Sequence, residues 1–579
     1  MQEAHYVARG RLPPEFIDAA MRLVDSGITK EEFGKMKVGL AREFDVGHIP
    51  SDIAILTHLD DARFERAKRV LLTKPVRTGS GVTVVAVMTK PLPCPHGKCT
   101  YCPGGPKSFF GDVPQSYTGN EPATMRGMRA GYDIYTQVFT RLEQYIVTGH
   151  NPEKVELILM GGTFTSYSRD YQDEVVHDIY QAMNDFSEMF YPGGDFNYAV
   201  FKSFYELPGS IMDKDRATRL NARILAAKKE SVRYTQSIAD QQRENETAAI
   251  RCIGFTIETR PSHARLEHAD LMLEQGCTRV ELGVQTTFDE VLTKVHRDHT
   301  VQDTIESIAV LKDLGFKINY HIMLGLPLMT PQRDIEAAHR LFDDPAFRPD
   351  MLKLYPCMVM PGTALYYDWK QGRYTPYSTE QAAEVIAEVK GFVPKYVRIM
   401  RVQRDIPTKV TSAGVGQTNL RQVVERKCAE RGITCACIRC REVRGRAVED
   451  TGLEVIEYDA SGGKEFFISI IGPADALLGF CRMRFPGKQL RKEISVLSAI
   501  IRELHVYGTA IGIGDDGKVQ HRGVGRQLME EAERIAREHG KDKMLVISGV
   551  GVREYYARLG YVHDGPYMSR IIGGENGQE

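Results

Sequence analysis

The chain has 579 residues, of which 42% are hydrophobic and 26% charged, a composition that indicates a globular protein and excludes a disordered or fibrous one. Its 75 Lys and Arg residues nearly balance 76 Asp and Glu residues, so the net charge of −1 excludes a uniformly basic nucleic-acid coat. At about 100–200 residues per domain, this length predicts roughly three or four domains.

No apolar run approaches the ~18 residues that cross a bilayer, and the N-terminal residues lack the apolar core of a signal peptide. We therefore expect a cytoplasmic protein with no membrane contact. The eleven cysteines are an odd number, which argues against a disulfide framework and favours metal binding by those that cluster. Two groups stand close together in the sequence: Cys94, Cys99 and Cys102, and Cys435, Cys437 and Cys440.

Apolar residues recur at helical spacing over residues 1–75, which predicts a helical N-terminal region. Its end, residues 63–77, is basic, and this run is either the solvated face of a helix or a surface for nucleic-acid phosphates. Over residues 76–370, six β-rich runs alternate with helical segments: 83–90, 155–162, 253–260, 279–285, 317–324 and 351–357.

Parallel strands with helical crossovers need such spacing, and functional groups then gather at the carboxyl ends of the strands. We therefore predict an α/β protein whose main domain is an open, partial (β/α)6 barrel. A polar stretch at about 184–250 interrupts the pattern as an insertion. Residues 371–450 form a basic connector with the second cysteine cluster, and residues 451–579 form a further α/β domain, with a helix at 526–540 that ends at Gly540.

The first cysteine cluster follows the first predicted strand, and thiolates are the natural ligands of iron–sulfur clusters. Three cysteines without a fourth leave one iron of a 4Fe-4S cluster open to a small chelating ligand. His96 as a fourth ligand is geometrically awkward, and a structural zinc site is the bland alternative. The loop after strand one of a βα barrel is a catalytic position, so the cluster resembles the three-cysteine motif of the radical S-adenosylmethionine family.

That resemblance implies that the bound cluster cleaves S-adenosylmethionine to a 5′-deoxyadenosyl radical. It also implies a set of S-adenosylmethionine-binding residues at the ends of the next strands: Gly161, Gly162, Thr163, Glu258, Arg260 and Gln285. A carboxylate facing the methionine ammonium and an Arg facing its carboxylate are charge-assisted contacts that suit a zwitterion. The alternatives are a simple strand-ending turn for the glycines and an ion pair within the barrel for Glu258 and Arg260.

Residues 520–525, QHRGVG, precede the C-terminal helix, and a Gly-rich turn at a helix N-terminus suits an anion. With the strands around it, this order resembles the Gcn5-related acetyltransferase fold. The resemblance implies an acetyl-CoA site made by Glu503, Leu504, His505, Val506, Val524, Gly525, Arg526 and Tyr556. Tyr556 would protonate the leaving CoA thiolate, whereas the bland alternative for Tyr555 and Tyr556 is aromatic packing.

A radical S-adenosylmethionine barrel joined to such an acetyltransferase domain resembles the family of the catalytic (third) subunit of Elongator, which modifies the wobble uridine of tRNA. Collinear strings carry the resemblance, among them CPHGKCTYCPGGP (94–106), RVQRDIP (401–407) and RELHVYG (502–508). The family implies that an acetyl-derived radical adds to C5 of uridine 34 and that hydrolysis leaves 5-carboxymethyluridine. Lys154 matches a family position that contacts acetyl-CoA and is otherwise a solvated strand-end lysine.

The expected partner is a tRNA anticodon stem-loop, contacted by basic residues of the connector: Lys395, Arg398, Arg401 and Arg404. We allow for a homodimer and leave Elongator-type partner subunits open. The second cysteine cluster, Cys435, Cys437 and Cys440, predicts a structural zinc whose fourth ligand is left open between Cys428 and Cys357. The alternatives to the tRNA-modifying enzyme are a protein-lysine acetyltransferase with a structural RNA-binding barrel and a non-enzymatic RNA-binding scaffold.

Overall fold

The computed structural model describes residues 12–74, 78, 80–209, 213–443, 448–507 and 523–573. The chain forms two compact units. The first contains the chain up to Val85 together with Asp133–Glu156 and Glu174–Ile253, and the second contains the rest. The boundary runs through three strands of one sheet, β1, β4 and β5, whose bounds are given below.

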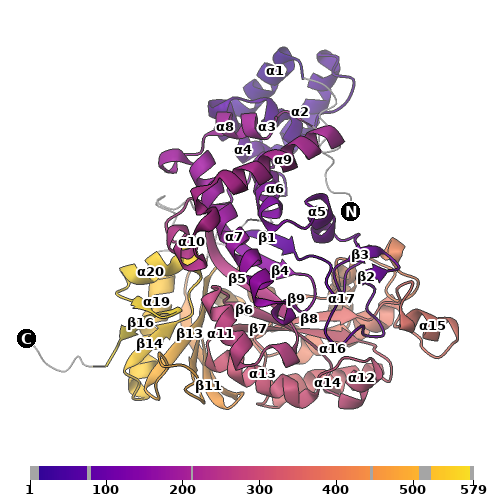
Figure 1. Cartoon of the computed structure of the whole chain (residues 1–579), viewed down its shortest axis with the longest axis vertical. Coiled ribbons are helices and arrows are strands. Elements are labelled where there is room, and N and C mark those ends of the chain that lie inside the picture. Colours follow the sequence, from indigo (N-terminus) through magenta and orange to yellow (C-terminus); the bar gives the residue numbers. More distant parts are fainter. Residues whose placement is uncertain are drawn as a thin grey trace, which may run out of the picture. The chain divides into compact units, whose positions relative to one another are not determined.

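The first unit is mainly helical, as predicted for the N-terminal region (Figure 1). Its helices are α1 (Pro14–Asp25), α2 (Lys30–Glu43), α3 (Asp52–His58), α4 (Asp61–Leu71), α6 (Ile134–Val147), most of α7 (Arg169–Phe190), α8 (Tyr198–Phe204), α9 (Lys214–Glu230) and α10 (Ile238–Asn245). Helix α2 begins with a capping box in which Thr29 and Glu32 satisfy each other's backbone N–H groups.

The predicted insertion at 184–250 has an aromatic core, although its sequence is mostly polar. Phe190 of α7 packs against Phe201 of α8 with ring centroids 5.5 Å apart, and Tyr205 lies 4.7 Å from Phe201. All three rings are fully buried. Such aromatic pairs add about 0.5–1.5 kcal/mol beyond their buried area, so this segment is an integral part of its unit.

The predicted partial barrel is confirmed, with one strand more than expected. Its strands follow the order β1 (Thr83–Met88), β4 (Lys154–Met160), β5 (Arg251–Thr259), β6 (Arg279–Gln285), β7 (Lys317–Leu324), β8 (Met351–Pro356) and β9 (Arg398–Arg401). Strands β5 to β9 pair in parallel, and β6 is buried along its whole length. The additional strand, β9, lies in the basic connector, where four residues are too short to show a period.

Helices follow these strands and lie along one face of the sheet (Figure 1): α11 (Leu266–Glu274), α13 (Val301–Asp313), α14 (Pro331–Asp343) and α16 (Thr379–Phe392). Shorter elements lie in the segments that follow β1, β6 and β8: β2 (Gly105–Ser108), β3 (Gly111–Val113), α5 (Pro122–Arg129), α12 (Asp289–Lys294) and α15 (Ala364–Lys370). Helix α17 (Leu420–Glu430) packs against α16, and α18 (Ile438–Arg441) packs against β9. The sheet is therefore covered by helices on its outer side and leaves its strand ends to loops.

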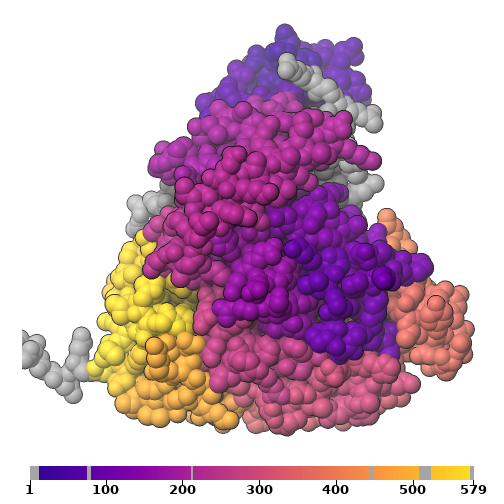
Figure 2. Space-filling view, viewed as in Figure 1, coloured from indigo at the N-terminus to yellow at the C-terminus, as the bar shows by residue number. Residues whose placement is uncertain are grey.

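The C-terminal domain has a second seven-stranded sheet. Its order is β10 (Gly452–Ala460), β11 (Gly463–Gly472), β12 (Ala476–Phe485), β13 (Ser498–Val506), β14 (Lys543–Val546), β16 (Tyr567–Ile571) and β15 (Val562–Asp564). Two helices complete it, α19 (Val524–Glu538) and α20 (Arg553–Arg558). Figure 2 shows the orange and yellow surface of this domain directly against the pink surface of the barrel residues that belong to the same unit.

Strands β13 and β14 are the one parallel pair of this sheet, and they pair over half of β13 only. The pairing runs from Ser498 with Lys543 to Ile501 with Val546. Beyond Ile501, residues Glu503–Val506 pair with β12, and none of the other described strands pairs with them. The strands therefore separate after Ile501, which leaves backbone groups of β13 facing an opening in the sheet. None of the described helices is long and apolar enough to cross a membrane.

Candidate active site

The first cysteine cluster lies in the loop that follows β1. The Cys94 Sγ atom lies 3.8 Å from Thr163 Oγ1, and Cys102 Sγ accepts a hydrogen bond from the Ser116 N–H at 3.3 Å. Burial raises the pKa of Cys94, and it raises the pKa of Cys102 to about 11. Thiolates at these positions therefore need a cationic ligand to form.

The spacing of Cys94, Cys99 and Cys102 fits an iron–sulfur cluster better than a single ion. Around one tetrahedral zinc, with Zn–S bonds of about 2.3 Å, the ligand sulfurs lie roughly 4 Å apart. Among the described residues, the groups whose ligand atoms all lie within 4.8 Å of one another do not include this trio. A 4Fe-4S cluster offers a different iron to each thiolate and so needs ligands that stand further apart.

A partly buried cation, Arg297, lies beside the cysteine loop. Its guanidinium donates to the Gly283 carbonyl oxygen at 2.8 Å and points toward Cys99 Sγ at 3.7 Å. Although burial alone would lower the pKa of Arg297, the neighbouring Tyr101 and Cys99 raise it. Arg297 thus places a positive charge where thiolates of a bound cluster carry negative charge. No motif in the sequence pointed to this residue.

Arg260 anchors the cysteine loop through His96. Its guanidinium hydrogen-bonds His96 Nδ1 and donates to Asp298 Oδ2 at 2.8 Å, and the side chain is 2% exposed. The other ring nitrogen of His96 lies 3.3 Å from Cys99 Sγ. Burial, together with the charge of Arg260, lowers the pKa of His96 to about 4, so the ring is neutral. The contact of Arg260 with S-adenosylmethionine stays a prediction.

The Gly161-Gly162-Thr163 turn after β4 lies next to Cys94. Both glycines have positive φ, 131° and 111°, which side chains rarely tolerate. A Cβ at Gly161 would lie 2.0 Å from Thr89 Oγ1, so the backbone approaches the loop as closely as it does because no side chain intervenes. This geometry suits a turn that presents backbone groups to a ligand beside the cluster.

Of the other predicted ligand residues, Glu258 and Gln285 lie on strand ends nearby. The Tyr117 hydroxyl donates to Glu258 Oε2 at 3.0 Å. Gln285 has a φ of +71°, and its amide lies close above Gly283, beside the guanidinium of Arg297. The structure therefore brings residues from β4, β5 and β6 to the same end of the sheet as the cysteine loop.

A row of charged residues inside the barrel was missed by the sequence analysis. Glu281 on β6 is 1% exposed and hydrogen-bonds His321 Nε2 at 2.7 Å and Lys353 Nζ. The ligand atoms of Glu258, Glu281 and His321 all lie within 4.8 Å of one another. The sequence did contain a signal for this row, because each of these apolar strands includes a charged or titratable residue. Since charges are rarely buried without a partner, such residues predict partners inside the barrel.

In the C-terminal domain, a small pocket lies at the start of α19. It has a volume of about 310 Å³ and is lined by Gly523, Gly525, Arg526, Tyr555, Arg558 and Leu559. Gly523 is the N-cap, has a φ of +96° and offers no side chain to the first N–H groups of the helix. Those groups and two guanidinium side chains fit an anion such as a pyrophosphate. Residues 520–522 of the predicted turn lie outside the described residues.

Some of the predicted acetyl-CoA residues would bind the ligand through their backbone, and others through their side chains. Residues Glu503–Val506 line the opening between β13 and β14, where their backbone can bind an extended ligand. The Glu503 carboxylate itself is bonded to Arg482 Nε at 2.9 Å. Tyr555 lines the pocket, whereas Tyr556 is 7% exposed within the hydrophobic core. The general-acid role of Tyr556 stays a prediction, and burial raises its pKa.

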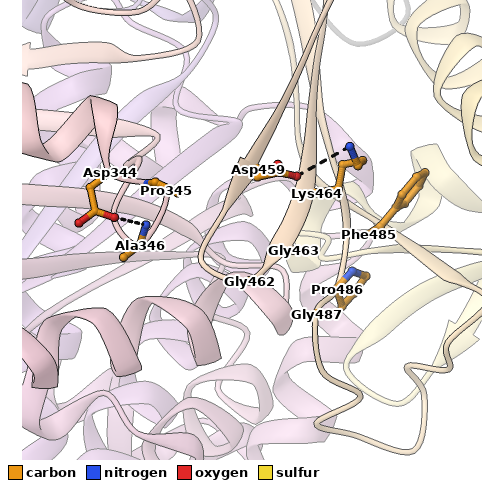
Figure 3. Close-up of a pocket in the computed structure, with 10 residues that line it drawn as sticks. All are labelled: Asp344, Pro345, Ala346, Asp459, Gly462, Gly463, Lys464, Phe485, Pro486 and Gly487. Atoms are coloured by element: carbon orange, nitrogen blue, oxygen red, sulfur yellow. Dashed lines mark hydrogen bonds and ion pairs between the residues drawn. The ribbon is translucent and has the colours of Figure 1, made fainter.

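A larger cavity, of about 690 Å³, lies away from these residues (Figure 3). It is formed by the β10–β11 turn, residues 344–346 and residues 485–487. The polar groups that line it bond to one another: Lys464 pairs with Asp459, and Asp344 accepts a hydrogen bond from the Ala346 N–H at 2.9 Å. None of the predicted site residues lines it, so it is not the candidate active site.

The second cysteine cluster is a tight group. The sulfurs of Cys435, Cys437 and Cys440 all lie within 4.8 Å of one another, close enough for one tetrahedral ion. Hydrogen bonds from the other two thiols lower the pKa of Cys437, and Lys390 Nζ donates to Cys440 Sγ at 3.3 Å. Cys428 and Cys357 do not belong to this group of described ligand atoms.

The four predicted tRNA residues differ in how far their charge is neutralised. Lys395 bonds Glu454 at 2.8 Å and Asp475, and Arg398 bonds Glu442 and the Tyr507 hydroxyl. Arg401 pairs with Asp405 but is 47% exposed. Arg404 donates to the Ser116 carbonyl and lies 5.9 Å from the Tyr117 ring centroid.

Two other predicted sites lie in the first unit. Lys154 begins β4, at the amino end of the strand, whereas the Gly161-Gly162-Thr163 turn follows its carboxyl end. In the basic run of the N-terminal region, Arg63 pairs with Asp18 and Arg66 with Asp25. Arg77 lies outside the described residues.

The fold and the site together define an enzyme that joins a radical S-adenosylmethionine domain to an acetyltransferase domain. Residues 93–341 match the model of the Radical SAM superfamily, and residues 349–430 match the Radical_SAM C-terminal domain. Residues 441–561 match the Acetyltransferase (GNAT) family.

Known proteins are similar to this chain over most of its length. The tRNA uridine(34) acetyltransferase of Methanocaldococcus jannaschii is 44% identical over 541 residues, covering 91% of each chain. Elongator complex protein 3 of Saccharomyces cerevisiae is 40% identical over 577 residues, covering 96% of this chain and 95% of the yeast one. The solved structure of Methanocaldococcus infernus Elp3 with an N-terminal deletion is 37% identical, covers 85% of this chain and 99% of its own, and superposes with a TM-score of 0.68. The chain belongs to the family of Elongator complex protein 3 and the archaeal tRNA uridine(34) acetyltransferases.

Proposed function

We propose that this enzyme places a carboxymethyl group on C5 of uridine 34 of tRNA, using acetyl-CoA and a 5′-deoxyadenosyl radical derived from S-adenosylmethionine. The observation that carries the proposal is the presence, in one chain, of a three-cysteine loop spaced for a cluster and an anion pocket at α19. The name of the archaeal relatives supplies the substrate class, uridine 34 of tRNA.

A 4Fe-4S cluster, held by Cys94, Cys99 and Cys102, would supply the electron that cleaves S-adenosylmethionine. We propose that the Gly161-Gly162-Thr163 turn and Gln285 bind the methionine end of that molecule, together with Glu258 and Arg260. Support comes from the positive φ angles of both glycines and from the 3.8 Å separation between Thr163 and Cys94. Arg297 and Arg260 hold the cysteine loop through their hydrogen bonds to Cys99 and His96.

Acetyl-CoA would bind along β13 and at the start of α19. The backbone of residues Glu503–Val506 is open beyond Ile501, and Val524, Gly525 and Arg526 begin the helix that faces the anion pocket. We retain Tyr556 as the general acid for the leaving thiolate and Lys154 as a contact to acetyl-CoA.

The tRNA anticodon stem-loop would contact the connector through Arg401 and Arg404. Arg401 has a partly exposed side chain, which suits pairing with a phosphate. Arg404 lies beside the ring of Tyr117, a position that suits stacking on a base. Lys395 and Arg398 are also proposed contacts, but their acidic partners reduce the charge that they offer to phosphates. We further propose a structural zinc at Cys435, Cys437 and Cys440.

Anaerobically reconstituted full-length enzyme tests the function. With tRNA, S-adenosylmethionine, acetyl-CoA and a reductant, we expect 5′-deoxyadenosine and a 5-carboxymethyluridine detected by mass spectrometry of the digested tRNA. Cys99→Ala should abolish both products. Acetyl transfer to a lysine peptide without any change in the tRNA would instead favour the lysine acetyltransferase alternative, and a carboxymethylated base formed by Cys99→Ala would exclude the radical route.

A further inference from the structure

In the charged row inside the barrel, Glu281 is the acceptor of every hydrogen bond described here. Glu281 accepts hydrogen bonds from Asn319 Nδ2 at 3.1 Å, from His321 Nε2 at 2.7 Å and from Lys353 Nζ. Burial alone would raise the pKa of Glu281, but the charge of Lys353 and the bond from His321 hold it well below its ordinary value. Glu281 is therefore an ionised carboxylate, which can only accept hydrogen bonds.

This carboxylate sets the tautomer of His321. Because Nε2 donates to an acceptor that carries no proton, Nε2 must bear the hydrogen. Burial and the Lys353 charge lower the pKa of His321, so the ring is neutral and Nδ1 keeps its lone pair. Among the described residues, no hydrogen bond to Nδ1 is found. The His321 side chain is 18% exposed whereas Glu281 is 1% exposed, so the histidine is the accessible member of the pair.

The histidine lies close to the residues that lead to the cysteine loop. Its ring nitrogen and the carboxylate oxygen of Glu258 lie within 4.8 Å of each other, and Glu258 is bonded to Tyr117. Next to Tyr117 in the chain, Ser116 donates to Cys102 Sγ and accepts from Arg404. Hydrogen bonds, together with the short separation between His321 and Glu258, thus connect the cysteine loop, His321 and the connector arginine.

We propose that His321 is the residue that distinguishes uracil from cytosine in the barrel, by accepting a hydrogen bond from N3–H of the flipped base at Nδ1. This inference rests on the proposed function, and it makes His321 a specificity-determining residue positioned by Glu281. Enzymes that act on a base read its Watson–Crick edge in a pocket. Uracil presents a donor at N3, whereas cytosine presents an acceptor there, so a neutral Nδ1 pairs with the first and faces a lone pair of the second.

A purely structural ion triad explains Glu281 and Lys353, because both are buried and paired. It does not explain why the accessible nitrogen of His321 is left as an acceptor beside Tyr355, whose ring lies edge-on 5.7 Å away. The charge of Arg404 acts on the Tyr355 hydroxyl, so these two side chains lie near each other. An aromatic ring and guanidinium donors suit a pyrimidine with two carbonyl groups.

The test compares the affinities of anticodon stem-loop RNAs that differ only at position 34. We expect the wild-type enzyme to bind the uridine RNA about tenfold or more tightly than the cytidine RNA and the 3-methyluridine RNA, because an unmatched buried polar group costs that much. His321→Leu should lose this preference while the KM for S-adenosylmethionine changes less than twofold. His321→Gln, which retains an acceptor, should recover part of it, and His339→Leu on α14 should behave as wild type.

An unchanged uridine-to-cytidine affinity ratio in His321→Leu would overturn the inference, as would a loss of S-adenosylmethionine binding without a change in that ratio. If His321→Leu does not fold or take up iron, the wild-type enzyme alone still tests the proposal through its affinity for the 3-methyluridine RNA. Equal affinity for the uridine and 3-methyluridine RNAs contradicts the proposal. Failure of the wild type to carboxymethylate any RNA would instead contradict the proposed function, and the affinity ratio would still be measurable.

Discussion

The guanidinium of Arg502 in the acetyltransferase domain is bonded to both carboxylate oxygens of Asp350, which directly precedes barrel strand β8. The two contacts measure 2.8 Å and 2.6 Å, and both residues are fully buried. The charges of Arg502 and Arg482 outweigh burial and hold the pKa of Asp350 well below its ordinary value. Arg482 in turn pairs with Glu503, so the network connects the barrel to the strand proposed to bind acetyl-CoA.

Removing one partner of this network should destabilise the protein strongly. Arg502→Met leaves the buried Asp350 with Arg482 and the buried Glu465 with Arg484 as remaining arginine partners, and both carboxylates lose their hydrogen bonds to Arg502. We therefore expect the free energy of unfolding to fall by about 3–5 kcal/mol. Urea unfolding of the full chain measures this. Arg534→Met, which breaks an exposed ion pair on α19, is the control and should leave the unfolding midpoint unchanged. A strictly additive Asp350→Leu/Arg502→Met double variant would show that the pair is not coupled.

The stability of the protein should depend on pH through Asp334 on α14. Its carboxylate accepts from the Gly325 N–H at 2.8 Å and the Tyr377 hydroxyl at 2.7 Å, and burial raises the pKa of Asp334 to about 6. In the unfolded chain the pKa of an Asp is about 4. As the pH rises from about 4 to about 6, this group therefore ionises more readily in the unfolded chain, and the free energy of unfolding falls. Relative to wild type, Asp334→Asn should therefore gain about 2–3 kcal/mol between pH 4 and pH 8. An unfolding free-energy difference that stays constant with pH would contradict this.

Gly161→Ala should damage the turn beside Cys94. The new Cβ would lie 2.0 Å from Thr89 Oγ1, on a backbone with a φ of 131°, and we expect a cost of about 1–3 kcal/mol. Because the turn must move, the affinity for S-adenosylmethionine, measured by calorimetry, should fall at least about tenfold. Gly416→Ala is the matched control, since a Cβ there meets no atom within 4 Å. Equal losses in both variants would refute the steric explanation.

Arg297→Met should make the reduction potential of a bound cluster more negative. Its guanidinium lies 3.7 Å from Cys99 Sγ, and a cation and donor near a cluster sulfur stabilise the reduced form. Loss of about 1 kcal/mol for one electron corresponds to a shift of roughly 40 mV. A redox titration followed by electron paramagnetic resonance measures it. The exposed Arg340→Met is the control, and an unshifted potential in Arg297→Met would rule out this role.

Cys437→Ser should remove zinc from the protein without removing iron. Hydrogen bonds from the two neighbouring thiols lower the pKa of Cys437. Loss of a direct ligand should weaken zinc binding by more than the roughly 10–100-fold caused by losing a residue that only hydrogen-bonds a ligand. Elemental analysis of purified protein gives both metals per chain. Cys428→Ser tests whether Cys428 is the fourth zinc ligand. If this variant retains its zinc, another ligand completes the site. Full zinc content in Cys437→Ser would refute the zinc site.

Local sequence patterns predicted the elements well where apolar periodicity was long. The six barrel strands and the α19 helix lie where the sequence placed them, because each combines a clear period with turn residues at its ends. Strand β10 was missed, since its residues alternate between exposed and half-buried positions and include three charged residues, Glu454, Glu457 and Asp459.

The sequence by itself determined which chemistry the protein carries. Cysteine spacing, the Gly-Gly turn and the Gly-rich helix start are short-range features, and covalent neighbours alone bring their groups together. Only the tertiary structure decided which charges meet. Arg260 with His96, Arg297 with Cys99, Glu281 with His321 and Arg502 with Asp350 are separated by between 40 and 198 residues. Such pairs depend on strand order and register, because the cost of burying one charge is offset only by a partner that the fold brings to it from elsewhere in the chain.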